Sequence, residues 1–134
     1  MKEDNDDIKA RTRQTADLYF HGYPGELAYS LWREFDKELA RDMSLFITGH
    51  LYSRERIPHR VRQLCVVSAL TVLERTDELK MHIHAALNVG CTPGEVAEAI
   101  FQMITYGGVP VANTGLKVLR EVLQQRGQWP IQQE

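Results

Sequence analysis

The stretch that decides the fold is residues 76–92, TDELKMHIHAALNVGCT. Glu78 and His82 lie four residues apart in it, so a helix with 3.6 residues per turn places both on one face. Ala86 and Gly90 continue the same row in steps of four. Because both are small, a neighbouring helix can approach closely beneath the polar pair. The pattern predicts a helix with a carboxylate and an imidazole on one face.

The turn after this helix is marked by residues with known positional preferences. Gly90 suits the left-handed position that follows a helix C-terminus. Thr92 suits the N-cap of the next helix, and Pro93 suits its first position. Glu95 then completes a capping box with Thr92. These residues predict a helix–turn–helix that fixes where the polar pair points.

Helical periodicity recurs along the rest of the chain. Apolar residues repeat every three or four positions, and no strand alternation or hairpin signal is present. Asp36 suits a cap, so residues 26–47 form one kinked helix or two, and Gly49 is expected to end them. We predict an all-α fold of about six helices. The expected helical segments are 8–20 (a short helix or an ordered arm), 26–47, 59–74, 77–89, 95–106 and 111–125.

The segment 64–73, LCVVSALTVL, is apolar on nearly all faces. It extends at least over 61–74, too long for a typical strand, so we interpret it as a helix buried on most sides. A small monomer cannot easily cover such helices, which favours a homo-oligomer. We expect one domain over 1–134, with an N-terminal arm at 1–20 and a C-terminal tail at 127–134.

The composition excludes several classes of protein. The 134 residues are 43% apolar and 25% charged, with a net charge of −2, so no basic field favours nucleic acid. The acidic start is unlike a signal peptide, and no apolar run reaches the about 18 residues of a membrane span. We expect a cytoplasmic protein. Cys65 and Cys91 are too few for a disulfide framework or a zinc site, and we expect both to be buried free thiols.

Residues in and around the first stretch keep a specific order and spacing. They are Gly49, Tyr52-Ser53-Arg54, Arg62, Asp77-Glu78-Leu79, His82-Ile83, Ala85-Ala86-Leu87-Asn88, Gly90, Thr92, Glu95-Val96, Tyr106, Gly108-Val109-Pro110 and Ala112-Asn113. Over residues 35–122 this pattern resembles the carboxymuconolactone decarboxylase family. That family belongs to a wider group that contains the alkyl hydroperoxidase D proteins.

The resemblance implies an all-helical subunit that assembles as a ring-shaped homo-oligomer, a trimer or a hexamer. It also implies a decarboxylase without a cofactor or metal. Its substrate would be an anionic carboxylated γ-lactone from aromatic catabolism. In the typical reaction of the family, γ-carboxymuconolactone gives the β-ketoadipate enol-lactone and CO2.

The sequence departs from its relatives at three places. The hydroperoxidase branch carries a Cys-x-x-Cys pair where this chain has Arg75 and Glu78, so thiol-based peroxidase chemistry is unsupported. Many relatives have a glutamate at the position of Gln63, which cannot act as a base. Decarboxylases commonly have an arginine at the position of His84, so that residue either alters substrate anchoring or has no effect.

The resemblance, read with the chemistry of the side chains, assigns candidate roles. His82 is the candidate proton donor, since imidazole titrates near neutral pH, and Glu78 would orient it and keep it protonated. The candidates for substrate binding are Arg62, Arg54, Tyr106, Asn113 and Gln63.

Simpler interpretations compete with these roles. A Glu–His pair at this spacing is often only a surface pair that stabilises its helix. Arg62 can be a solvated charge at a helix start, and Tyr106 and Asn113 can simply pack the turn before the last helix. Two other functions stay open: an oxidoreductase of the hydroperoxidase type, and a non-catalytic ring-forming protein that binds a small molecule or partner.

Overall fold

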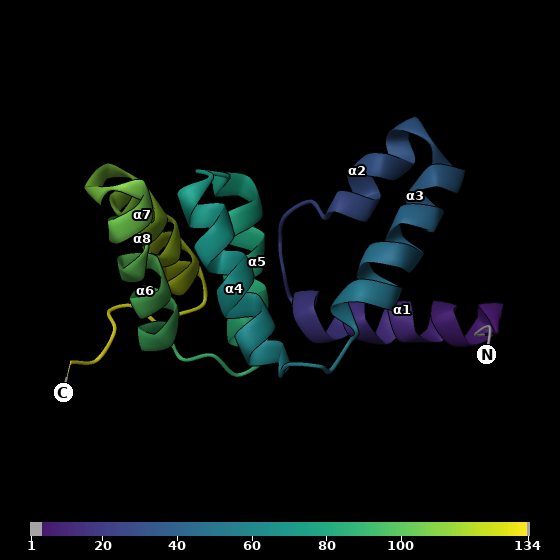
Figure 1. Cartoon of the computed structure of the whole chain (residues 1–134), viewed down its shortest axis with the longest axis horizontal. Coiled ribbons are helices and arrows are strands. Elements are labelled where there is room, and N and C mark those ends of the chain that lie inside the picture. The colour runs from purple at the N-terminus through teal and green to yellow at the C-terminus, as the bar shows by residue number, and fades with distance from the viewer. Residues whose placement is uncertain (1–3, 134) are drawn as a thin grey trace. The chain divides into compact units, whose positions relative to one another are not determined.

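The computed structural model describes residues 4–133, and these residues form helices without any strand (Figure 1). The prediction of an all-α fold is confirmed. The elements are α1 (Asn5–Phe20), α2 (Ala28–Phe35), α3 (Lys37–Ser44), the π-helix η1 (Leu45–Tyr52), α4 (His59–Val72), α5 (Thr76–Asn88), α6 (Pro93–Gln102), α7 (Ile104–Gly107) and α8 (Val109–Gln125). None of the described helices is both long and apolar enough to cross a membrane.

The described residues have more helical elements than the expected six because the regions 26–52 and 93–107 are divided. Asp36 is extended and accepts a hydrogen bond from the backbone N–H of Leu39 at 2.9 Å, so it ends α2 and caps α3. Gly49 lies inside η1 and does not end the helix, so that prediction is wrong. A Cβ atom at Gly49 would lie 2.2 Å from the hydroxyl oxygen of Thr12, which shows that the glycine permits close contact between η1 and α1.

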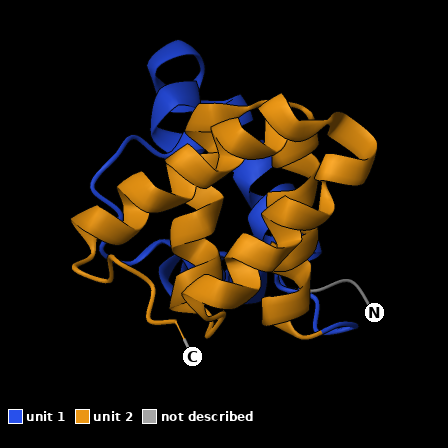
Figure 2. Cartoon of the chain, turned by 90° about the vertical axis from the view of Figure 1, so that its left-hand side faces the viewer, with its two compact units in different colours: residues 1–57 blue, residues 58–134 orange. Residues whose placement is uncertain are grey.

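The chain forms two compact units, Met1–Ile57 and Pro58–Glu134 (Figure 2). In the first unit α1 packs on η1, and α2 packs on α3. The hydroxyl of Tyr19 donates to the backbone carbonyl of Tyr52 at 3.3 Å and so ties α1 to η1. Asp4 caps α1, which begins at Asn5 and so starts three residues before the helix expected at 8–20.

The second unit is built around one apolar core. Helices α4 and α5 lie side by side, and α6 and α8 pack against them (Figure 1). The completely buried members of the core include Val67, Ile83, Val96, Ile100 and Leu123. These residues come from all four helices, so the helices of this unit support each other, and α5 is held firmly in place.

One side of α4 faces outward. Val67 and Thr71 are buried, but Cys65 and Ala69 are exposed, and Leu73 keeps 61% of its surface exposed. The expectation that residues 64–73 are buried on most sides is therefore wrong for this chain taken alone. The helix gives only one side to the core of its unit, and the apolar residues on the other side remain available for contacts with another protein surface.

Gly115 of α8 should be intolerant of a larger side chain. A Cβ atom there would lie 2.9 Å from a methyl group of Ile100 and 3.1 Å from a methyl group of Thr71, so three helices meet without spare room. We expect Gly115→Val to lower the free energy of unfolding by about 2 kcal/mol, as overpacked core sites do. Urea unfolding beside Gly94→Val provides the measurement, because a Cβ atom at Gly94 makes only an ordinary contact, 3.9 Å from the hydroxyl oxygen of Thr92. Equal losses in the two variants would contradict close packing at Gly115.

Candidate functional site

His82 lies on the buried side of α5. Only 8% of its surface is exposed, and its neighbours along the helix, Leu79 and Ile83, are core residues. The predicted row of four-residue steps holds in the structure, since Ala86 is also fully buried. Gly90 follows the helix with a φ of 100°, the left-handed conformation expected of it. The local sequence therefore places an imidazole at the edge of an apolar core.

A hydrogen bond joins His82 to Gln63 of α4. The Nδ1 atom of His82 and the Oε1 atom of Gln63 are 3.0 Å apart. Gln63 is completely buried, and its amide nitrogen Nε2 has no hydrogen-bond partner among the residues that the structure describes. The site thus contains two buried polar side chains from adjacent helices.

Burial lowers the pKa of His82 from 6.5 to about 4. Removing the imidazole from water penalises its charged form, and burial is the only cause of the shift. The ring is therefore neutral at pH 7 in the free protein. The expectation that a neighbouring carboxylate keeps His82 protonated is wrong.

Glu78 does not hold His82. It lies in the exposed first turn of α5, beside Asp77, where acidic residues favourably oppose the helix dipole. Within residues 4–133 no hydrogen bond or ion pair joins it to His82, whose ring is hydrogen-bonded to Gln63. The spacing of four residues puts the pair on one side of α5, but the first turn extends beyond the core. A catalytic role for Glu78 in another capacity stays a prediction.

The other candidate residues are spread over several elements. Arg62 precedes Gln63 in the first turn of α4 and is half-buried, with its Nε atom fully covered. Tyr106 on α7 and Asn113 on α8 are both exposed, and neither makes a hydrogen bond to His82 or Gln63. Arg54 is exposed and belongs to the first unit. Of the candidate cations, Arg62 is the one adjacent in sequence to a member of the buried pair.

His84 belongs to a separate polar cluster. The guanidinium of Arg126, just after α8, donates to the Nδ1 atom of His84 at 3.0 Å and to the side-chain oxygen of Asn88 at 3.1 Å. Arg126 also donates through Nε to Gln128 at 2.9 Å. The cluster joins the end of α8 to α5 and involves no residue of the candidate site. His84 thus connects two helices in this structure.

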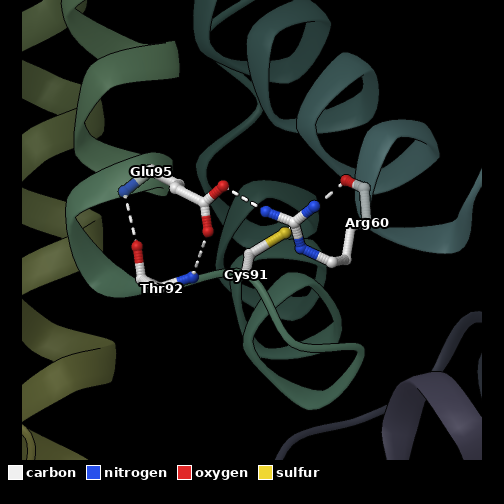
Figure 3. Close-up of polar contacts among 4 residues, drawn as sticks. All are labelled: Arg60, Cys91, Thr92 and Glu95. Carbon is white, nitrogen blue, oxygen red and sulfur yellow. Dashed lines mark hydrogen bonds and ion pairs between the residues drawn. The ribbon is translucent and has the colours of Figure 1, made fainter.

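Cys91 lies in the turn between α5 and α6, next to an ion pair (Figure 3). Its thiol donates to the backbone carbonyl of Arg60 at 3.5 Å, and the side chain of Arg60 pairs with Glu95. The predicted capping box is confirmed, because Glu95 and Thr92 exchange hydrogen bonds of 2.9 and 3.1 Å. Burial raises the pKa of the Cys91 thiol, which disfavours the reactive thiolate.

The two thiols should differ in reactivity. Cys91 is 4% exposed, whereas Cys65 is exposed on α4, so the expectation of two buried thiols is right only for Cys91. We expect iodoacetamide at pH 8 to alkylate Cys65 at least about tenfold faster than Cys91, since reaction requires an accessible thiolate. Mass spectrometry of timed samples, with Cys65→Ser as the control, gives both rates. Faster labelling of Cys91 would show that its turn opens readily.

Residues 37–121 match the model of the Carboxymuconolactone decarboxylase family. This chain belongs to that family. The residues that match the family model include α4 and α5, and therefore both Gln63 and His82. Within residues 4–133, no three His, Cys, Asp or Glu side chains gather in a group that could hold a metal ion.

Two curated proteins are similar to this member of the carboxymuconolactone decarboxylase family. The 4-carboxymuconolactone decarboxylase of Acinetobacter baylyi is 33% identical over 94 residues, which cover 70% of each chain. An uncharacterized 15.0 kDa protein from the nqo9-nqo10 intergenic region of Paracoccus denitrificans is 35% identical over 83 residues, 60% of this chain and 62% of that protein. The chain is therefore carboxymuconolactone decarboxylase-like.

Sequence reasoning missed the pairing of His82 with Gln63. The two residues are 19 positions apart on different helices, and Gln63 was considered only as a group that binds substrate. One signal was present, because Gln63 directly precedes the apolar run 64–73. A polar side chain at the start of a buried helix needs a polar partner.

Proposed function

We propose that this chain is a lyase that removes CO2 from a carboxylated γ-lactone without a cofactor, with His82 as its proton carrier. The observation that carries the proposal is the buried imidazole of His82, held by Gln63 within the part of the chain that matches the family. Similarity to the 4-carboxymuconolactone decarboxylase of Acinetobacter baylyi supports the class of substrate. We propose γ-carboxymuconolactone, an intermediate of aromatic catabolism, as the substrate to test first.

The substrate itself can accept the electrons that decarboxylation releases. When the bond between the γ-carbon and the carboxylate breaks, its electron pair enters the conjugated C=C–C=O system of the lactone. A dienolate forms, with negative charge on the carbonyl oxygen. Protonation of the carbon next to that carbonyl gives the enol-lactone. One CO2 leaves and one proton is consumed, so the protein must bind an anion, stabilise a developing oxyanion and deliver a proton to carbon.

His82 is suited to deliver this proton after substrate binding. The free imidazole is neutral at pH 7 because burial lowers its pKa to about 4. An anionic substrate beside the ring favours the imidazolium form, since an opposite charge within a few ångströms raises the pKa of a histidine. The proton taken up with the substrate is then transferred to carbon, and the ring returns to its neutral form.

Arg62 is the side chain that we propose to bind the substrate carboxylate. Its guanidinium stays charged and can form two parallel hydrogen bonds with a carboxylate. It is next to Gln63 on α4, which keeps it in the same part of the second unit as the proton carrier. Arg54, Tyr106 and Asn113 remain further candidates for substrate contacts. Each is exposed in the single chain.

We propose that the chain also assembles as a homo-oligomer, a trimer or a hexamer. Several large apolar side chains are exposed in the single chain, among them Phe35 at 84%, Phe46 at 62% and Leu73 at 61%. Exposed apolar groups of this size favour association. Light scattering on the eluting protein would give its mass, and a monomer at micromolar concentration would remove this part of the proposal.

The test of the function is CO2 release from γ-carboxymuconolactone by the purified protein. We expect equal amounts of CO2 and enol-lactone, with one proton consumed per CO2. The same lactone without its γ-carboxylate is the control and should not react. A folded protein that releases no CO2 would remove the proposed substrate. Binding of the lactone without turnover would then favour a non-catalytic binding protein.

A further inference from the structure

The hydrogen bond between Gln63 and His82 has a defined direction. The Oε1 atom of an amide can only accept, so the proton in the 3.0 Å contact belongs to the Nδ1 atom of His82. A neutral imidazole carries one proton. When that proton is on Nδ1, the Nε2 atom holds a lone pair. The arrangement therefore selects one of the two neutral forms of the ring.

The amide of Gln63 is not explained by packing alone. Its Nε2 atom is buried, and the part of the chain that the structure describes supplies it with no hydrogen-bond partner. An unpaired buried N–H costs free energy, which an apolar side chain of similar size would avoid. The other half of the amide, the Oε1 atom, is hydrogen-bonded to His82. This combination indicates that the amide serves the imidazole.

We propose that Gln63 is the positioning residue of His82: its amide oxygen holds the Nδ1 proton, so that Nε2 is the ring atom that takes up and delivers the proton of the reaction. Because the amide is neutral, it orients the ring without favouring the imidazolium form. The positive charge then arises only when an anionic substrate is present. The role of Nε2 in the reaction rests on the proposed function, but the assignment of the ring proton to Nδ1 does not.

The first test uses the protein without substrate. Nitrogen NMR of 15N-histidine-labelled protein reports which ring nitrogen carries the proton, and the missing signals of His82→Gln assign the resonances. We expect the Nδ1–H form of His82 to dominate between pH 6 and pH 8. In Gln63→Met, which keeps the side-chain length, we expect a mixture of both forms. An Nε2–H form in the wild type, or the same single form in Gln63→Met, would overturn the proposal.

The second test uses Gln63→Glu, which replaces the neutral amide with a carboxylate of the same shape. A carboxylate beside the ring raises the pKa of a histidine. The charged side chains nearest in sequence on the two helices, Arg62 on α4 and Lys80 on α5, are unchanged, as is Glu78. We expect the NMR titration of His82 to move up by at least about one pH unit in Gln63→Glu and to stay within about half a unit in Gln63→Met. No difference between the variants would overturn the proposal.

Kinetics connect the tautomer to the reaction. With γ-carboxymuconolactone we expect Gln63→Met to lower kcat about tenfold or more and to change KM less than about threefold. In Gln63→Glu the pH at which kcat/KM falls should increase together with the NMR titration, because kcat/KM reports groups of the free enzyme. Substitution of a residue with a merely structural role would not shift the pH dependence of kcat/KM. If the wild type does not turn over the lactone, the proposed function fails while the NMR results still decide the role of Gln63.

Discussion

Replacing His82 with alanine should reduce CO2 release from the lactone by about 10²- to 10⁴-fold, the range that a positioned acid or base contributes. His82 is the buried imidazole of the matched region, and its hydrogen bond to Gln63 orients it. Without the ring, the dienolate must take its proton from water that is not held in position. Initial rates of CO2 release at saturating substrate provide the measurement.

His84→Ala is the matched control for this experiment. It removes another buried histidine from the same helix, two positions further on, where the side chain contacts Arg126. We expect its rate to stay within about threefold of the wild type after correction for the folded fraction. Comparable losses in the two variants would point to damage to α5 instead of loss of a proton carrier. A near-normal rate in His82→Ala would remove His82 from the mechanism.

The second large effect concerns stability in acid. The pKa of His82 is about 4 in the folded chain and 6.5 in the reference state, so between these values the unfolded chain binds a proton that the folded chain does not. The contribution of His82 to the free energy of unfolding is therefore fully present above pH 6.5, and it is lost as the pH is lowered toward 4. A shift of this size corresponds to about 3 kcal/mol, at 1.36 kcal/mol per pKa unit.

Urea unfolding at pH 7 and pH 4 measures this contribution. The wild type should lose about 3 kcal/mol more over this interval than His82→Gln, which has no imidazole to charge. Other titrating groups are common to both proteins, so they cancel in the comparison. Parallel loss of stability in both proteins would show that His82 is charged, or exposed to water, in the folded chain.

The helical part of the second unit was predictable because its signals are local. The capping box of Thr92 and Glu95 and the left-handed Gly90 depend on residues a few positions apart, and both are present. The helix expected at 111–125 is likewise present as α8 (Val109–Gln125). Residues 26–52, in the first unit, were harder to predict. Gly49 has a close contact with Thr12 of a distant helix, and a sequence pattern alone does not show such a contact.

The sequence by itself determined the all-α fold, the turn after α5 and the choice of His82 as the candidate proton carrier. The fold and the turn follow from periodicity and capping, which act over one or two turns of helix, whereas the choice of His82 follows from the resemblance to the family and the chemistry of imidazole. The tertiary structure alone decided that Gln63, not Glu78, is hydrogen-bonded to the imidazole and that Cys65 is exposed. The physical reason is that helical spacing determines which side chains share a face, whereas burial and hydrogen-bond partners depend on which helices pack against that face. The packing of α4 on α5 buries Gln63 beside His82, while the first turn of α5, with Glu78, remains in solvent.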